Sequence, residues 1–121
     1  MISIKSAKNL FSISALGPIL LVKIEETIDD EGIKNLTETL SESIVKYKSK
    51  AVIIDLANVD ILDSYLASHL ESLAYTTKLL QAEVIISGLK GPTIITLLEF
   101  DIKIEGVNFA LDVNHALDQL S

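Results

Sequence analysis

The sequence predicts a single α/β domain that spans residues 1–121, with a mixed sheet of about four to five strands and helices packed mainly on one face. The chain has 121 residues, enough to bury one core but seldom two. Hydrophobic residues make up 49% of it and aromatic residues only 5%, so the core must be aliphatic. Short apolar runs alternate with segments of helical periodicity, which is typical of layered α/β folds.

The predicted fold opens with a β-hairpin. Residues 10–14 and 19–24 are rich in β-favouring side chains, and between them lies the pair Gly17 and Pro18, where a turn is expected. These two strands form the start of the sheet.

Two helices and two buried strands follow. The first helix begins near Asp29 and ends near Lys50, and the second begins with Asp63 or Ser64 as its cap. Residues 51–56 and 83–87 are nearly continuous apolar runs, as in strands buried on both faces. Because two parallel strands joined by a helix form a right-handed unit, Ser64 is expected at the carboxyl edge of the sheet, where sites gather. The helical spacing rests on Ile33, Leu36, Leu40, Ile44 and Tyr47, and then on Leu66, Leu70, Leu73, Thr77 and Leu80.

The last third of the chain predicts a turn at 88–92, a short helix at 93–100, a strand at 102–107 and a closing helix. Pro92 suits the first position of its helix. The face of the closing helix comprises Ala110, Leu111, Val113, Ala116, Leu117 and Leu120.

Charge and composition exclude several functions. The formal net charge of −7 disfavours nucleic-acid binding, and the one tight basic group, Lys46, Lys48 and Lys50, suits a helix C-terminus. The absence of cysteine excludes disulfides and thiol catalysis. No run reaches the roughly 18 apolar residues of a membrane span, and no signal cleavage site follows the N-terminal apolar stretch. We expect a cytoplasmic protein without membrane contact.

The polar loop 55–64 lacks the features of a metal or catalytic site. Its acidic residues do not follow the spacing of calcium loops. Ser64 lies in no G-x-S-x-G motif, His69 is five residues along the same helix and points elsewhere, and the placement of His115 depends on the tertiary fold. Gly88 and Gly91 do not have phosphate-loop spacing. We therefore expect no enzyme activity, no metal and no cofactor.

Two interpretations of Ser64 remain open from the residues alone. It caps a helix, or it is a phosphorylation site, because a helix N-terminus favours a phosphate by about 0.3–1 kcal/mol. Asp60 and Asp63 would repel the added charge. A phosphate here would therefore change the docking surface more than the fold.

Three stretches resemble the STAS domains, the family of anti-sigma factor antagonists. They are residues 51–67 (AVIIDLANVDILDSYLA), 83–89 (EVIISGL) and 94–99 (IITLLE), and within the family they are most similar to the small stressosome subunits of the RsbS type. The resemblance implies phosphorylation at Ser64, after Asp63. Asp101 stands where these relatives usually have glycine. The kinase-docking residues are expected to be Asn58, Asp60, Asp63, Ser64 and Tyr65.

The resemblance also implies partners. An RsbT-type serine kinase would be held by the unmodified chain, would phosphorylate Ser64 with its own ATP and would then be released into a stress-signalling pathway. An RsbX-type PP2C phosphatase would reset the serine, and RsbR-type co-antagonists would join homo- and hetero-oligomers through STAS contacts. RsbR-type proteins carry a second phosphorylatable threonine at the start of the first helix, where this chain has Asp29 to Gly32. This difference favours the RsbS type over the RsbR type.

Two other functions compete with this one. The first is a free anti-sigma factor antagonist that binds an anti-sigma kinase directly through the same serine. The second is a hydrolase with Ser64 as nucleophile, which the lack of an activating base disfavours.

Overall fold

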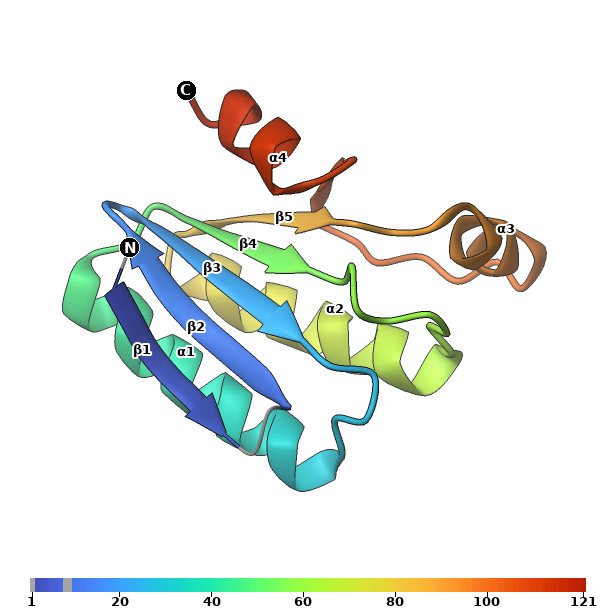
Figure 1. Ribbon diagram of the computed structural model, residues 1–121, viewed down its shortest axis with the longest axis horizontal. Helices are drawn as coiled ribbons and strands as arrows, with labels where there is room; N and C mark the ends of the chain where they lie inside the picture. The colour runs from blue at the N-terminus through green and yellow to red at the C-terminus, as the bar shows by residue number, and fades with distance from the viewer. Residues whose placement is uncertain (1, 8–9) are drawn as a thin grey trace.

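A computed structural model describes residues 2–7 and 10–121, which form one six-stranded sheet in the order β1-β2-β3-β4-β5-β6 with four helices (Figure 1). The strands are β1 (Ile2–Ala7), β2 (Phe11–Leu16), β3 (Ile19–Ile24), β4 (Ala51–Asp55), β5 (Glu83–Ser87) and β6 (Asn108–Ala110). The helices are α1 (Asp30–Tyr47), α2 (Ser64–Leu79), α3 (Gly91–Glu99) and α4 (Val113–Gln119).

The sheet is mixed, which confirms the predicted fold class. Strands β1, β2 and β3 pair antiparallel, whereas β3, β4, β5 and β6 are parallel to one another. The sheet has one strand more than the four to five expected, because residues 2–7 pair with β2. The predicted hairpin around Gly17 is present as β2 and β3.

Helices α1 and α2 cover one face of the sheet, and α4 lies on the opposite face (Figure 1). The main core lies on the α1 and α2 side, where residues such as Leu36, Leu70 and Ile54 are fully buried. A smaller cluster joins α4 to the other face through Ala116, Leu21, Ile53 and Ile85. The expectation that the helices pack mainly on one face is therefore confirmed.

Near the C-terminus one predicted element is wrong, and the predicted closing helix is present as α4 but starts later than expected. Residues 102–107 form no strand, and the last strand is instead Asn108–Ala110, beside β5. The apolar alternation over 102–107 has another cause, since Ile104 is buried and Ile102 and Val107 pack against the core. The closing helix starts at Val113, because the side chain of Asp112 accepts a hydrogen bond from the His115 N–H at 2.8 Å and so caps it there.

Helices α1, α2 and α3 end in the same turn, with a non-glycine residue in the left-handed region. Lys48, Gln81 and Asp101 have φ values of 50°, 67° and 51°. At the end of α3 the N–H of Ile102 donates to the Leu97 carbonyl at 2.9 Å, while that of Asp101 donates to Leu98 at 3.3 Å. This is the Schellman pattern. Asp101 thus adopts the backbone that glycine favours, although it is not glycine.

Candidate functional site

Ser64 is the first residue of α2, and its side chain is exposed. The loop before it, residues 56–63, leaves the carboxyl end of the central strand β4. Because β3, β4 and β5 are parallel, the loops that follow them meet at one edge of the sheet. The structure therefore places Ser64 at the edge where the sequence predicts it.

Asp63, and not Ser64, caps α2. Asp63 has an extended backbone, with φ −90° and ψ 176°, and its carboxylate accepts a hydrogen bond from the Leu66 N–H at 2.9 Å. Among the residues that the structure describes, we find no hydrogen bond that the Ser64 hydroxyl makes. The helix end is therefore satisfied without Ser64, and its hydroxyl is available to a partner.

The base of the Ser64 loop is joined to the start of the β5–α3 loop by buried polar contacts. The Leu56 N–H donates to the Ser87 carbonyl at 2.9 Å, and the Ser87 hydroxyl donates to the Asp55 carboxylate at 3.0 Å. Gly88, with φ +79°, lies so close that a Cβ there would be 2.7 Å from the Asp55 carboxylate and 2.8 Å from the Ala57 nitrogen. The start of the β5–α3 loop therefore lies in close contact with the start of the loop that leads to Ser64.

The outer part of the Ser64 loop is held to α3 by Asp60. Its carboxylate forms an ion pair with Lys90, and its backbone carbonyl accepts a hydrogen bond from the Thr93 hydroxyl at 3.2 Å. Between Ile61 and α3 lies a small hollow of about 180 Å³. The loop thus has a defined position relative to α3.

The five residues predicted to dock a kinase are all exposed and lie on this loop or in the first turn of α2. Asn58 donates a hydrogen bond from its amide to the Glu25 carboxylate at 3.1 Å, so the β3–α1 loop also contributes to the site. Tyr65 is about half exposed, and its ring contacts that of His69 edge-on, at 4.6 Å between centroids. Their role in docking stays a prediction.

Ile61 and Lys90 lie at this edge but are not among the residues that the sequence predicts for the site. Ile61 is 70% exposed, and a lone large apolar residue in a polar loop is a signal that could have revealed it. The pairing of Lys90 with Asp60 spans 30 residues of sequence, and no local pattern indicates it.

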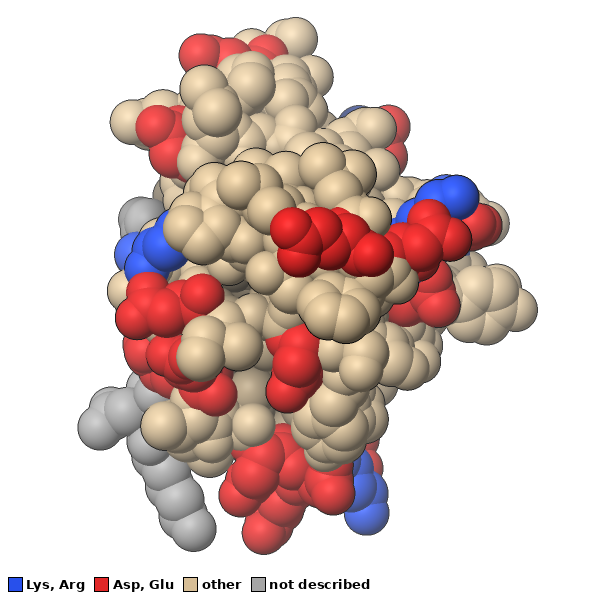
Figure 2. Space-filling view, turned by 90° about the vertical axis from the view of Figure 1, so that its right-hand side faces the viewer, with Lys and Arg blue, Asp and Glu red and all other residues tan. Residues whose placement is uncertain are grey.

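The edge that carries Ser64 is acidic. Figure 2 faces the side of the molecule toward which β3, β4 and β5 point, and acidic patches cover more of it than basic ones. The loops and helix starts at this edge contribute Glu25, Glu26, Asp29, Asp60 and Asp63, all outside the sheet. A partner with a basic docking surface would be attracted to it.

The two histidines contact residues other than Ser64. His69 contacts the Tyr65 ring, and its Nε2 lies 3.9 Å from the Asp30 carboxylate of α1. His115 is in α4, where its Nδ1 accepts a hydrogen bond from the Leu111 N–H at 3.0 Å. Within residues 2–7 and 10–121, no group of three or more His, Cys, Asp or Glu side chains could hold a metal ion. Nor does any helix of these residues have the length and apolarity to cross a membrane.

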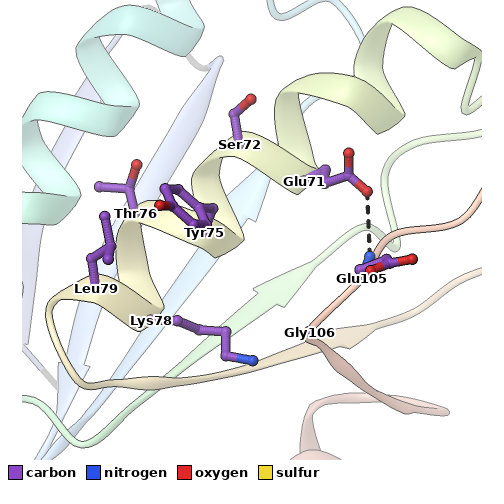
Figure 3. Close-up of a pocket in the computed structure, with 8 residues that line it drawn as sticks. All are labelled: Glu71, Ser72, Tyr75, Thr76, Lys78, Leu79, Glu105 and Gly106. Atoms are coloured by element: carbon purple, nitrogen blue, oxygen red, sulfur yellow. Dashed lines mark hydrogen bonds between the residues drawn. The ribbon is translucent and has the colours of Figure 1, made fainter.

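An open groove of about 890 Å³ runs along the second half of α2 (Figure 3). On the α2 side it is lined by residues such as Tyr75 and Leu79, and on the other side by Glu105 and Gly106. The Glu105 N–H donates to the Glu71 carboxylate at 3.4 Å across one end.

The fold is a mixed α/β sheet in which an exposed serine, Ser64, begins the helix that follows a central strand. The model of the STAS domain family matches residues 11–116, and the chain belongs to that family.

Solved structures agree with this assignment. An RsbS variant from Moorella thermoacetica superposes with a TM-score of 0.75 at 27% identity, over 89% of this chain and 92% of that one. A chain from a study of the molecular architecture of the stressosome gives 0.77 at 28% identity, over 89% and 94%. The anti-sigma factor antagonist SpoIIAA, with 0.67 at 12% identity over 91% and 96%, shows the fold alone.

A curated relative is the RsbT co-antagonist protein RsbRA of Bacillus subtilis, 27% identical over 89 residues. The match covers 74% of this chain but only 32% of RsbRA, so the chain corresponds to about a third of that protein.

Proposed function

We propose that the chain is an antagonist of the RsbS type, a stressosome scaffold that holds a switch serine kinase and releases it when Ser64 is phosphorylated. The likeness to an RsbS structure and to a stressosome chain supports the type. The kinase would be of the RsbT type, RsbR-type co-antagonists would share the assembly, and an RsbX-type phosphatase would remove the phosphate.

One observation carries the proposal: the cap of α2 is Asp63, which leaves the exposed Ser64 hydroxyl without a structural task. A serine that capped the helix would lose its hydrogen bond on modification, and the helix end would weaken. Here the hydroxyl can receive a phosphate while the Asp63 cap stays in place.

The added phosphate would act on the partner and not on the fold. It brings about −1.5 to −2 charges to an exposed position, next to Asp63 and four residues after Asp60. The favourable field of the helix end, about 0.3–1 kcal/mol, is offset by these carboxylates. The phosphorylated edge therefore differs mainly in charge and shape, which is what a docked kinase contacts.

The chain itself would not be an enzyme. The partner kinase supplies ATP, Mg²⁺ and the catalytic base, and this chain supplies the acceptor hydroxyl and the docking surface. The exposed residues Asn58 and Asp60 in the preceding loop, and Asp63 and Tyr65 on either side of Ser64 in the sequence, would form the contact with the kinase.

The test is phosphorylation by an RsbT-type kinase with ATP and Mg²⁺, followed by mass spectrometry and a kinase pull-down. The wild-type chain should gain one phosphate and lose the kinase. Ser64→Ala should stay unmodified and retain it. Ser68→Ala is the matched control, because Ser68 is also exposed on α2, one turn further on.

Phosphorylation of Ser64→Ala at the wild-type level, or kinase release without phosphate transfer, would contradict the proposal. A complex that remains small in the presence of RsbR-type partners, yet binds an anti-sigma kinase, would instead support the free antagonist.

A further inference from the structure

A hollow of about 500 Å³ lies at the carboxyl edge of the sheet, between the loops that follow β4, β5 and β6. Three segments that are far apart in the sequence line it: Asp55 with Ala57, residues 88–90, and residues 111–114. Small-molecule sites usually have volumes of about 300–1,000 Å³. The edge where parallel strands end is also the usual place for ligands in α/β sheets.

The Asp55 carboxylate is the one buried polar side chain in this lining, with 8% of the residue exposed. Its Oδ1 accepts a hydrogen bond from the Ser87 hydroxyl at 3.0 Å. Within the part of the chain that the structure describes, we find no donor to its Oδ2. Nor is Oδ2 sealed inside the protein, because the one fully enclosed side-chain oxygen there without a partner is that of Ser49. One oxygen of the carboxylate is therefore free to face a ligand in the hollow.

The hydrogen bonding of Asp55 is incomplete for an ionised group at this depth. An ionised carboxylate can accept about four hydrogen bonds, and buried charges are normally paired. The ion pairs among the described residues do not include Asp55, and its one donor, the Ser87 hydroxyl, is neutral. A cation with N–H groups would supply both the missing charge and the missing donors.

The other charges around the hollow also favour a cation. Asp112 adds a second carboxylate to the lining. Lys90 is the one cation of the lining, and its ammonium group forms an ion pair with Asp60 of the neighbouring loop. An anionic ligand would therefore meet two carboxylates, Asp55 and Asp112, with the nearby positive charge already paired.

Apolar side chains complete the lining. Leu89 and Val113 are half-buried and Leu111 is exposed, and all three line the hollow. They can contact the carbon chain of a ligand whose charged end pairs with Asp55. A bare metal ion fits less well, because hard cations take six or more oxygen ligands and no group of three or more His, Cys, Asp or Glu side chains is present among the described residues.

From these observations we propose that this hollow binds a small organic cation, an ammonium or guanidinium group on a short apolar chain, whose N–H groups donate to the Asp55 carboxylate. The inference goes beyond the proposed function and does not depend on it. An occupant would also contact Ala57, at the base of the loop that leads to Ser64.

Titration of the full chain with butylammonium and butylguanidinium at constant ionic strength, followed by the amide signals in NMR spectra, tests this proposal. Both cations should cause saturable shifts at residues 55–57, 88–90 and 111–114. Butanol and butyrate carry a similar apolar chain without the positive charge, and they should cause no saturable shift at these residues.

Asp55→Asn should weaken the binding of both cations at least about tenfold, because it removes the charge that the N–H groups pair with. Glu83→Gln is the matched control: it removes one negative charge from an exposed position at the other end of β5. Its affinity should equal that of the wild type. Asn114→Trp keeps Asp55 and places a large side chain at an exposed position of the lining, so it should also weaken binding at least about tenfold. This variant decides the matter if Asp55→Asn does not fold.

Absence of saturable shifts with both cations would overturn the proposal, as would equal affinities of Asp55→Asn and Glu83→Gln or an unchanged affinity of Asn114→Trp. Equal binding of butanol would show a merely apolar hollow, and tighter binding of butyrate would show an anion site. Displacement of butylammonium by equimolar KCl or MgCl₂ would assign the hollow to an inorganic cation. Each of these three results would also overturn the proposal. None of these measurements uses a kinase, so their failure can be told from failure of the proposed function.

Discussion

The Ser87 hydroxyl donates a hydrogen bond to the Asp55 carboxylate, 3.0 Å away, at the carboxyl ends of two neighbouring strands. Both residues are buried. A carboxylate at such depth needs a partner, and this one joins the strand that leads to Ser64 with the strand that leads to α3.

Ser87→Ala should destabilise the fold by about 1–3 kcal/mol, because it leaves the buried Asp55 carboxylate without this donor. Urea unfolding of the variant and of Ser72→Ala, an exposed serine on α2, gives the comparison. The double variant Asp55→Ala with Ser87→Ala should lose less than the sum of the two single losses. Additive losses would mean that the two side chains do not interact.

Asp63→Ala should lower the free energy of unfolding by about 1 kcal/mol, since it removes the cap of α2. Ser64→Ala should stay within about 0.5 kcal/mol of wild type, because its hydroxyl serves no cap. Thermal or urea unfolding measures both. A larger loss for Ser64→Ala than for Asp63→Ala would reverse the assignment of the cap.

Gly88→Ala should be clearly destabilising, by at least about 1–2 kcal/mol from its left-handed backbone alone. The added Cβ would also meet the Asp55 carboxylate and the Ala57 backbone. Gly91→Ala is the matched control: it has open space for a Cβ and begins a helix, so its stability should change by less than about 0.5 kcal/mol. Equal losses of stability for Gly88→Ala and Gly91→Ala in urea unfolding would show that the two loops are not in close contact at Gly88.

Asp101→Gly should stabilise the protein by up to about 1 kcal/mol, because it places glycine at a left-handed helix end. Lys48→Gly and Gln81→Gly should behave alike, since their turns have the same hydrogen-bond pattern. A higher urea midpoint with an unchanged slope is the expected result. A lower midpoint for all three variants would mean that the greater conformational freedom of glycine in the unfolded chain outweighs the relief of backbone strain in the folded one.

The central elements could be predicted because each has a local signal. The buried runs at 51–56 and 83–87 and the leucine spacing of α2 correspond closely to β4, β5 and α2. The position of Ser64 at the carboxyl edge of the sheet can be predicted because Ser64 follows a buried strand that is parallel to the next one. The resemblance to STAS domains pointed to the same serine.

The remainder depends on contacts between distant residues. The alternation over 102–107 reports the burial of Ile104 but cannot say whether the backbone pairs with β5. The Asp60–Lys90 ion pair and the Ser87–Asp55 hydrogen bond each span about 30 residues. The sequence does not decide whether Asp63 or Ser64 caps α2, because both residue types suit the position and the backbone conformation selects one of them.

Strand β4 is buried at all five positions and paired along both edges. Its amide protons should therefore be among the slowest to exchange with solvent, opening only when the whole domain unfolds. The loop that leads to Ser64 starts at the end of this strand. If the proposed kinase binds and leaves at this edge, each cycle can proceed without opening the strand to which the loop is attached.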